Sequence, residues 1–324
     1  MKTIATYFTG YDLFGMGAQL AGYTGIFGID NHQPAVDFCH NNIGNHVVCG
    51  DVRSYNYIDI DVSHKHFSPE CKSFSDANLG GKETEFDLQC ARSIVRSLTE
   101  SPSETVSIEN VGGYANPKCK SFHEIILPFL QQDYFFWYSS YCSADYGVPQ
   151  TRRRLILRAI RKDQGKYLPA LIPPTHSNNP DSGLLPWVSW YDAIADIIPT
   201  LKPNKLANWQ KASLEEQGFD IKGQTVLISK DGSRKKEGYI NTFALVIPKD
   251  SPAPTIKAMG HDRHCQQYSI VIDGEVYRVS TEALASWQSM PKDCVFSGDN
   301  PTDCRGVGNG VPSLFAQKIM ESFA

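Results

Sequence analysis

The first part of the chain alternates short apolar runs with helix-forming stretches, and this pattern constrains the fold most. Apolar runs predict strands at Thr3 to Phe8, Gly25 to Asp30 and His46 to Val52, with helices expected at Met16 to Ala21 and Pro34 to Asn42. Strands that alternate with helices form a parallel sheet joined by crossover helices. The sequence therefore predicts an α/β fold whose ligand lies at the carboxyl ends of the strands.

The alternation continues through further strands and then stops. Strands are expected at His64 to Phe67, Thr105 to Val111, Tyr134 to Cys142 and Arg153 to Ile160, and helices at Glu83 to Leu98 and Phe122 to Gln131. After Lys162, closely spaced prolines break the pattern, because proline disrupts the interior of a helix and the middle of a sheet. Short apolar pieces remain, such as Thr225 to Ile228 and Thr242 to Ile247. We therefore expect a large α/β domain at 1–165 plus 300–324, which ends in an amphipathic helix, and a smaller, mostly β domain at 166–299.

Composition narrows the class of protein. The chain has 324 residues and a net charge of −4, so any nucleic-acid surface is confined to a basic patch, densest at Thr151 to Arg154. Nine cysteines are scattered without a Cys-x-x-Cys pair, which argues against a disulfide framework and a structural zinc site. No apolar run is long enough to cross a membrane. Asp12 interrupts the apolar N-terminal stretch, which argues against a signal peptide. We expect a cytoplasmic protein with reduced thiols and no metal.

Small and acidic residues follow the first three expected strands. The first strand runs into the glycine turn Phe8-Thr9-Gly10, and the next two end in Asp30 and Asp51. A glycine turn lets a nucleotide approach the backbone, while Asp30 could bond a ribose diol and Asp51 an adenine amino group. Each acid could instead cap a helix or stabilise a turn. Three such features on consecutive strands favour an adenosine-bearing ligand.

Three further features carry reactive or charged side chains. Cys71 follows the turn Ser68-Pro69, at the mouth of a strand, where a thiol is well placed to act as a nucleophile. Glu109 ends an apolar strand and could act as a general acid. Arg152 and Arg154 alternate on a strand, so they are expected to share a face that could hold a phosphate or a carbonyl oxygen. Taken singly, a structural thiol, a helix cap and a charged edge strand are the competing interpretations.

The order of these pieces resembles the cytosine carbon-five DNA methyltransferases over nearly the whole chain. The motifs that carry the resemblance are Phe8-Thr9-Gly10, Ala21-Gly22-Tyr23, Asp30, Asp51, Ser68-Pro69-Glu70-Cys71, Glu109-Asn110-Val111, Gln150-Thr151-Arg152-Arg153-Arg154 and Gly308-Asn309-Gly310-Val311-Pro312. Arg278-Val279-Ser280 and Trp287-Gln288-Ser289-Met290-Pro291 resemble a loosened form of the family's penultimate motif. The combination of the cysteine, Glu-Asn-Val and Gln-x-Arg-x-Arg motifs is the most specific part.

The resemblance implies a Rossmann-like class I methyltransferase sheet that binds S-adenosylmethionine and releases S-adenosylhomocysteine. It also implies that 166–299 is a target-recognition domain. The residues that it places around the cofactor are Phe8, Gly10, Asp12, Asp30, Asn31, Asp51, Val52, Phe86 and Asn309.

The resemblance further implies a covalent mechanism on a cytosine that is flipped out of the duplex. Cys71, as thiolate, would attack carbon six of the base. Glu109 would bond ring nitrogen three, and Arg154, together with Arg152, would hold the carbonyl oxygen. Carbon five would then accept the methyl group, and loss of its proton would release Cys71.

Two positions depart from the family's pattern. The family usually has a Gly-Gly pair where this chain has Asp12-Leu13, so a carboxylate is expected near the amino-acid end of the cofactor. The family usually has proline before the nucleophile, where this chain has Glu70. A carboxylate beside Cys71 disfavours the thiolate, and Lys72 is a candidate to offset it.

Several alternatives remain open from the residues alone. The expected partner is double-stranded DNA, with room for a cognate restriction endonuclease, and the expected state is a nucleoid-associated monomer. A tRNA cytosine methylase and a catalytically silent DNA-binding paralogue are the competing functions. Neither His64-x-His66 nor His261 to Cys265 supplies a complete set of metal ligands.

Overall fold

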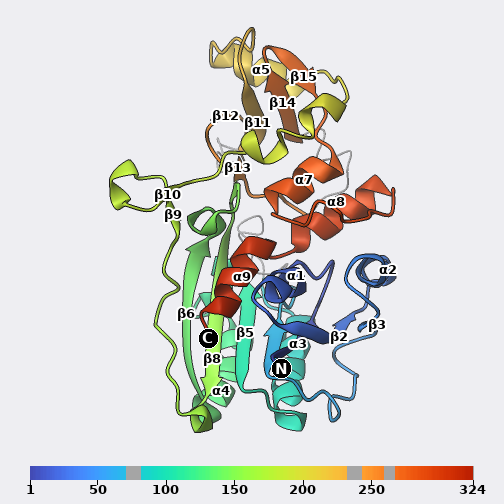
Figure 1. The fold of residues 1–324 in the computed structure, drawn as a ribbon, viewed down its shortest axis with the longest axis vertical. Helices are drawn as coiled ribbons and strands as arrows, with labels where there is room; N and C mark the ends of the chain where they lie inside the picture. The colour runs from blue at the N-terminus through green and yellow to red at the C-terminus, as the bar shows by residue number, and fades with distance from the viewer. Residues whose placement is uncertain (71–81, 232–242, 259–266, 324) are drawn as a thin grey trace. The chain divides into compact units, whose positions relative to one another are not determined.

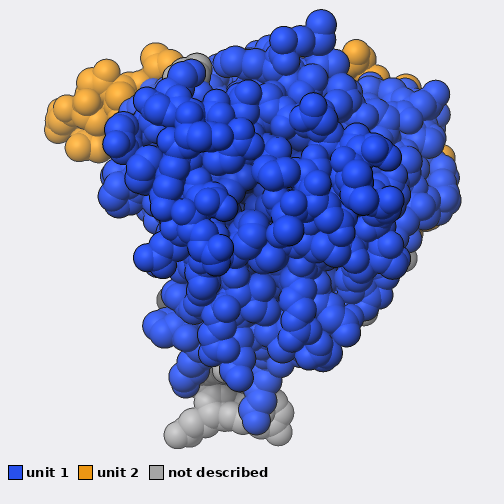
Figure 2. Space-filling view, turned by 90° about the horizontal axis from the view of Figure 1, so that it is seen from below, with its two compact units in different colours: residues 1–146, 153–175, 310–324 blue, residues 147–152, 176–309 orange. Residues whose placement is uncertain are grey.

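The computed structural model describes residues 1–70, 82–231, 243–258 and 267–323, which Figure 1 traces from one end of the chain to the other. The chain divides into two compact units, coloured separately in Figure 2. Unit 1 contains residues 1–146, 153–175 and 310–324, and unit 2 contains residues 147–152 and 176–309. The assignment of catalysis to 1–165 plus 300–324 and of target recognition to 166–299 stays a prediction.

The described residues of unit 1 form a seven-stranded sheet in the order β3-β2-β1-β4-β5-β8-β6. The first five of these strands are parallel, and β8 runs antiparallel to both β5 and β6. The strands are β1 (Thr3–Tyr7), β2 (Thr24–Asp30), β3 (Val47–Cys49), β4 (His64–Phe67), β5 (Thr105–Asn110), β6 (Tyr134–Cys142) and β8 (Arg153–Arg161). This topology confirms the predicted α/β fold, and only β3 is much shorter than the expected strand.

Helices connect the strands as the alternation predicts. They are α1 (Leu13–Leu20), α2 (Gln33–Asn42), α3 (Glu85–Glu100) and α4 (Leu127–Asp133). The first begins earlier than expected because the side chain of Asp12 accepts a hydrogen bond from the N–H of Gly15 and caps it. The helix expected at Phe122 to Gln131 is divided, since a π-helical turn at Ser121–Ile126 precedes α4.

The C-terminal helix α9 (Ser313–Glu321) belongs to unit 1 and packs against α1 (Figure 1). The two helices approach closely at Gly17, where an added Cβ would lie 2.2 Å from the carbonyl oxygen of Ser313. A side chain at Gly17 would force the helices apart. The end of the chain thus helps to hold the helix that follows the glycine turn.

The core of unit 1 contains a cluster of aromatic rings and one buried lysine. The ring of Tyr7 stacks on Phe67, with centroids 4.5 Å apart. Lys65, on β4, is fully buried, and its ammonium donates to the carbonyl oxygens of Ser97 (2.9 Å) and Ser101 (2.5 Å). Burial lowers the pKa of Lys65 to about 7.

Unit 2 has a sheet of its own, with four antiparallel strands in the order β12-β11-β14-β15 among the described residues. These are β11 (Val226–Asp231), β12 (Phe243–Pro248), β14 (Tyr268–Ile272) and β15 (Glu275–Tyr277). Unit 2 also contains the α-helices α5 (Asn208–Glu216), α7 (Thr281–Trp287) and α8 (Asn300–Asn309), and the short strands β7 (Gln150–Thr151), β9 (His176–Ser177), β10 (Leu185–Pro186) and β13 (Ala253–Pro254). A small core of Leu214, Val226, Ile228, Ala244 and Val271 packs α5 on this sheet.

Helices that could span a membrane, disulfides and clusters of metal ligands are all absent from the described part of the chain. None of its helices is both long and apolar enough to span a membrane. Its cysteines are all free thiols. Its His, Cys, Asp and Glu side chains form no cluster suited to a metal ion.

Candidate active site

The turn after β1 has an unusual backbone. Phe8 (φ 58°), Gly10 (φ 56°) and Asp12 (φ 49°) all adopt left-handed conformations. Such values are uncommon for residues other than glycine, and they persist where surrounding contacts enforce them. Apart from Gly10 and its chain neighbours, no atom of the described residues lies within 4 Å of the position that a Cβ of Gly10 would take, so the turn is open on that side.

Hydrogen bonds from β2 hold this turn. The N–H of Gly10 donates to Oδ2 of Asp30 at 2.8 Å, and the N–H of His32 donates to Oδ1 at 2.9 Å. The hydroxyl of Thr9 accepts a hydrogen bond from the N–H of Ile29 at 2.9 Å. The structure therefore brings Gly10 and Asp30 together, as expected for strand ends that meet at one edge of the sheet.

Asp12 faces the interior of unit 1. Its side chain is 2% exposed, accepts from the N–H of Gly15 at 3.1 Å, and lies 3.8 Å from Nε2 of His46. Burial raises the pKa of the Asp12 carboxyl, and the His46 ring partly offsets this effect. The departure from Gly-Gly is thus accommodated by a left-handed Asp that caps α1.

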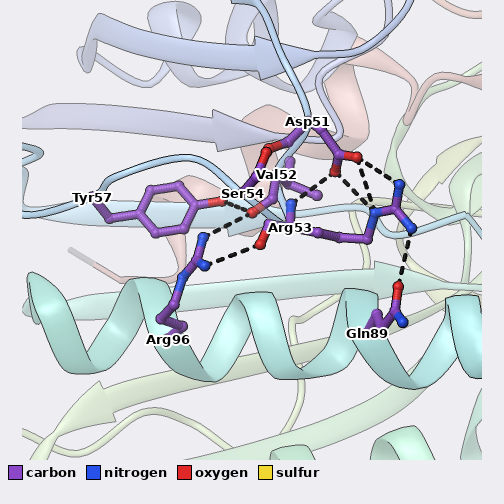
Figure 3. Close-up of polar contacts among 7 residues, drawn as sticks. All are labelled: Asp51, Val52, Arg53, Ser54, Tyr57, Gln89 and Arg96. Carbon is purple, nitrogen blue, oxygen red and sulfur yellow. Dashed lines mark hydrogen bonds and ion pairs between the residues drawn. The ribbon is translucent and has the colours of Figure 1, made fainter.

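The second acid, Asp51, belongs to a polar cluster with Arg53 and Gln89 (Figure 3). Both carboxylate oxygens of Asp51 accept hydrogen bonds from the side chain of Arg53, which lowers the pKa of Asp51. The guanidinium of Arg53 also lies over the ring of Phe86, 4.8 Å from its centroid. The structure therefore brings together Asp51 and Phe86 from the predicted cofactor set.

The other residues of that set are less closely connected. Asn31 is exposed after β2, and Val52 is buried beside Asp51. Asn309, at the end of α8, belongs to unit 2, and its carbonyl oxygen accepts a hydrogen bond from Arg152 at 3.3 Å.

Two of the expected catalytic residues of unit 1, Glu109 and Arg154, form an ion pair. Nε of Arg154, on β8, lies 2.9 Å from Oε1 of Glu109, near the end of β5. The antiparallel pairing of β5 with β8 places these side chains on adjacent strands. The side chain of Arg154 is 15% exposed and that of Glu109 is 9% exposed, so the pair is largely shielded from water.

Arg152 has different partners from Arg154. It is 1% exposed, belongs to unit 2, and donates to the carbonyl oxygens of Ile256 (3.0 Å) and Asn309 (3.3 Å). The strand β8 begins only at Arg153, so the strict alternation that would give the two arginines a shared face does not extend to Arg152.

Cys71 lies outside the described residues, but the segment before it is anchored. The ring of His66 is hydrogen-bonded to the hydroxyl of Ser68 (2.8 Å), and the side-chain amide of Asn110 donates to the carbonyl oxygen of Pro69 (3.3 Å). Asn110 follows Glu109 directly. The end of β5 therefore holds both the ion pair and the approach to Cys71.

Sequence reasoning gave no role to Arg53 or to His46. Arg53 follows Asp51 by two residues, a spacing at which an acid and a base on a turn can pair, so a signal was present. His46 directly precedes β3, and Asp12 follows β1, two strands away in the sheet. Their contact depends on this strand order, so no local sequence pattern predicts it.

Comparison with known proteins identifies relatives of the whole chain. The family model for the C-5 cytosine-specific DNA methylase matches residues 3–324. The type II methyltransferase M.NgoFVII of Neisseria gonorrhoeae is 27% identical over 335 residues, which cover 98% of this chain and 85% of that protein. The type II methyltransferase M1.HphI of Haemophilus parahaemolyticus is 24% identical, with 99% and 86% covered. Among solved structures, the Dnmt2 methyltransferase of S. pombe is similar in fold, with a TM-score of 0.64, 15% identity, and 100% and 97% of the two chains covered.

Proposed function

The chain belongs to the C-5 cytosine-specific DNA methylase family, and we propose that it transfers a methyl group from S-adenosylmethionine to carbon five of a cytosine in double-stranded DNA. Family membership confirms the resemblance and the enzyme class expected from the sequence. The observation that best supports the finer proposal is the ion pair of Glu109 with Arg154, because it joins the two charged motifs of the family at one strand end.

The strand ends of unit 1 fit an adenosine-bearing cofactor. The glycine turn is open at Gly10, two carboxylates follow at Asp30 and Asp51, and the ring of Phe86 is 39% exposed. A carboxylate suits ribose hydroxyls or an adenine amino group, and an exposed ring suits the face of a base. S-adenosylmethionine, when bound, supplies an electrophilic methyl group.

In the proposed mechanism the thiolate of Cys71 adds to carbon six of the flipped cytosine. Glu109 acts here in its protonated form: the carboxylic acid donates a hydrogen bond to ring nitrogen three and so stabilises the negative charge that develops on the ring. Arg154 holds both Glu109 and the carbonyl oxygen of the base. Once carbon five is methylated, loss of its proton breaks the bond to Cys71 and restores the ring. We assign the carbonyl contact to Arg154, since the Arg152 side chain already donates to two carbonyl oxygens of unit 2.

The proposal is tested with purified protein and methyl-labelled S-adenosylmethionine. Plasmid DNA and bulk tRNA are offered as separate acceptors, with the Cys71→Ser variant as control. We expect label in the cytosines of DNA and none with the variant. Label in tRNA alone would assign the chain to the RNA-modifying alternative, and label in neither would contradict the proposal.

A further inference from the structure

Arg53 covers the two groups that the proposed function assigns to adenine. Its guanidinium lies over the ring of Phe86. It also pairs with the carboxylate of Asp51 (Figure 3). We propose that Arg53 is a competing cation that lowers the affinity of this chain for its cofactor, because it has to release Asp51 and Phe86 before adenine binds. This inference rests on the proposed function.

The contacts of Arg53 occupy the acceptor sites of Asp51. Nε lies 3.0 Å from Oδ1 and 3.1 Å from Oδ2, and Nη2 lies 2.5 Å from Oδ2. The N–H of Arg53 adds a fourth bond, to Oδ1, at 2.8 Å. An adenine amino group would have to displace part of this set, since a carboxylate offers about four lone-pair sites.

The remaining donors hold the guanidinium in place. Nη1 donates to Oε1 of Gln89, on α3, at 3.0 Å, and the flat group lies 4.8 Å from the centroid of Phe86 on the same helix. A guanidinium over a ring excludes another flat group from that face. The side chain therefore blocks the acid and the ring together.

The arrangement allows Arg53 to move without its backbone. Arg96 donates to the carbonyl oxygens of Arg53 (3.0 Å) and Tyr55 (2.6 Å), which fixes the main chain around it. The side chains of Arg53 and Asp51 are 36% and 35% exposed, so water can replace the ionic contacts. Rotation of the Arg53 side chain toward solvent thus has a modest free-energy cost, and this cost weakens the binding of the cofactor.

The test measures the Kd of S-adenosylhomocysteine by calorimetry for the intact chain, Arg53→Ala and Arg92→Ala. Arg92 is a matched control, because it forms an exposed ion pair with Glu85 on the same helix. We expect Arg53→Ala to bind about three- to tenfold more tightly, the range expected for loss of an exposed ion pair and a cation–π contact. Arg92→Ala should leave the Kd unchanged.

Salt supplies a second readout. Raised salt screens the pair of Arg53 with Asp51. The intact chain should therefore bind more tightly in high salt, and Arg53→Ala should not respond. Equal or weaker binding by Arg53→Ala, with the intact chain still binding, would overturn the inference and leave the proposed function intact. If neither protein binds S-adenosylhomocysteine, both the inference and the proposed function are contradicted.

Discussion

Nε of Arg154 lies 2.9 Å from Oε1 of Glu109, so a cation from β8 neutralises a carboxylate at the end of β5. The two residues are far apart in the sequence and become neighbours through the antiparallel pairing of their strands. A shielded carboxylate without a partner is costly. The pair therefore serves stability and, in the proposed mechanism, holds Glu109 beside ring nitrogen three of the base.

Replacement of Arg154 by Ala should reduce both activity and stability. Methyl transfer should fall about a hundredfold or more, since a fixed donor to the reacting base is lost. The free energy of unfolding should fall by about 3 kcal/mol, because Glu109 is left shielded and unpaired. The measurements are methyl-transfer kinetics and urea unfolding, with Arg153→Ala, an exposed neighbour, as control. In the double variant with Glu109→Ala, part of the stability should return, and strict additivity of the two losses would contradict the coupling.

Lys65 should make the free energy of unfolding depend on pH in the neutral to alkaline range. Burial lowers its pKa from 10.5 to about 7, so between these values the unfolded chain binds a proton that the folded chain does not. Stability should therefore rise as pH increases through this window, by up to about 1.4 kcal/mol per pH unit. Urea unfolding of the intact chain and Lys65→Met at several pH values measures the difference. The exposed Lys166→Met variant serves as control, and parallel profiles for the intact chain and Lys65→Met would refute the assignment.

Asp12 should be replaceable by Asn but not by Ala. Asn adopts the left-handed conformation and can cap α1, whereas Ala does neither, so Asp12→Ala should cost about 1–2 kcal/mol. The raised pKa of Asp12 means that the ionised carboxyl opposes folding at neutral pH and that this penalty is relieved as pH falls. Asp12→Asn should therefore be at least as stable as the intact chain at neutral pH, with the advantage shrinking in acid. If the stability advantage of Asp12→Asn over the intact chain instead grew as the pH fell, the ionised Asp12 carboxyl would not oppose folding, and the prediction would be wrong.

Glu70→Pro restores the residue that the family usually has before its nucleophile. A carboxylate beside Cys71 disfavours the thiolate, so its removal should leave methyl transfer unchanged or raise it. The rate of transfer to plasmid DNA at saturating cofactor is the measurement. Complete loss of activity in Glu70→Pro would show that Glu70 is required rather than tolerated.

Local patterns predicted the fold well because strand and helix periods are properties of short segments. The alternation up to Ile160 predicted the strands of unit 1, and the glycine turn and Asp30 were placed at one edge of the sheet. Side-chain partners were predicted less well, since they depend on strand order. Neither the contact of His46 with Asp12 nor the different partners of Arg152 and Arg154 is encoded in neighbouring residues.

We propose that this chain methylates cytosine in DNA at carbon five, with Cys71 as the nucleophile that adds to carbon six of the base. The most direct test is nucleoside analysis of DNA from a host without cytosine methylases of its own, expressing either the intact chain or Cys71→Ser. We expect 5-methylcytosine only with the intact chain, and bisulfite sequencing would then map the modified sites. Host DNA without 5-methylcytosine despite soluble, folded protein, or equal amounts with the Cys71→Ser variant, would contradict the claim.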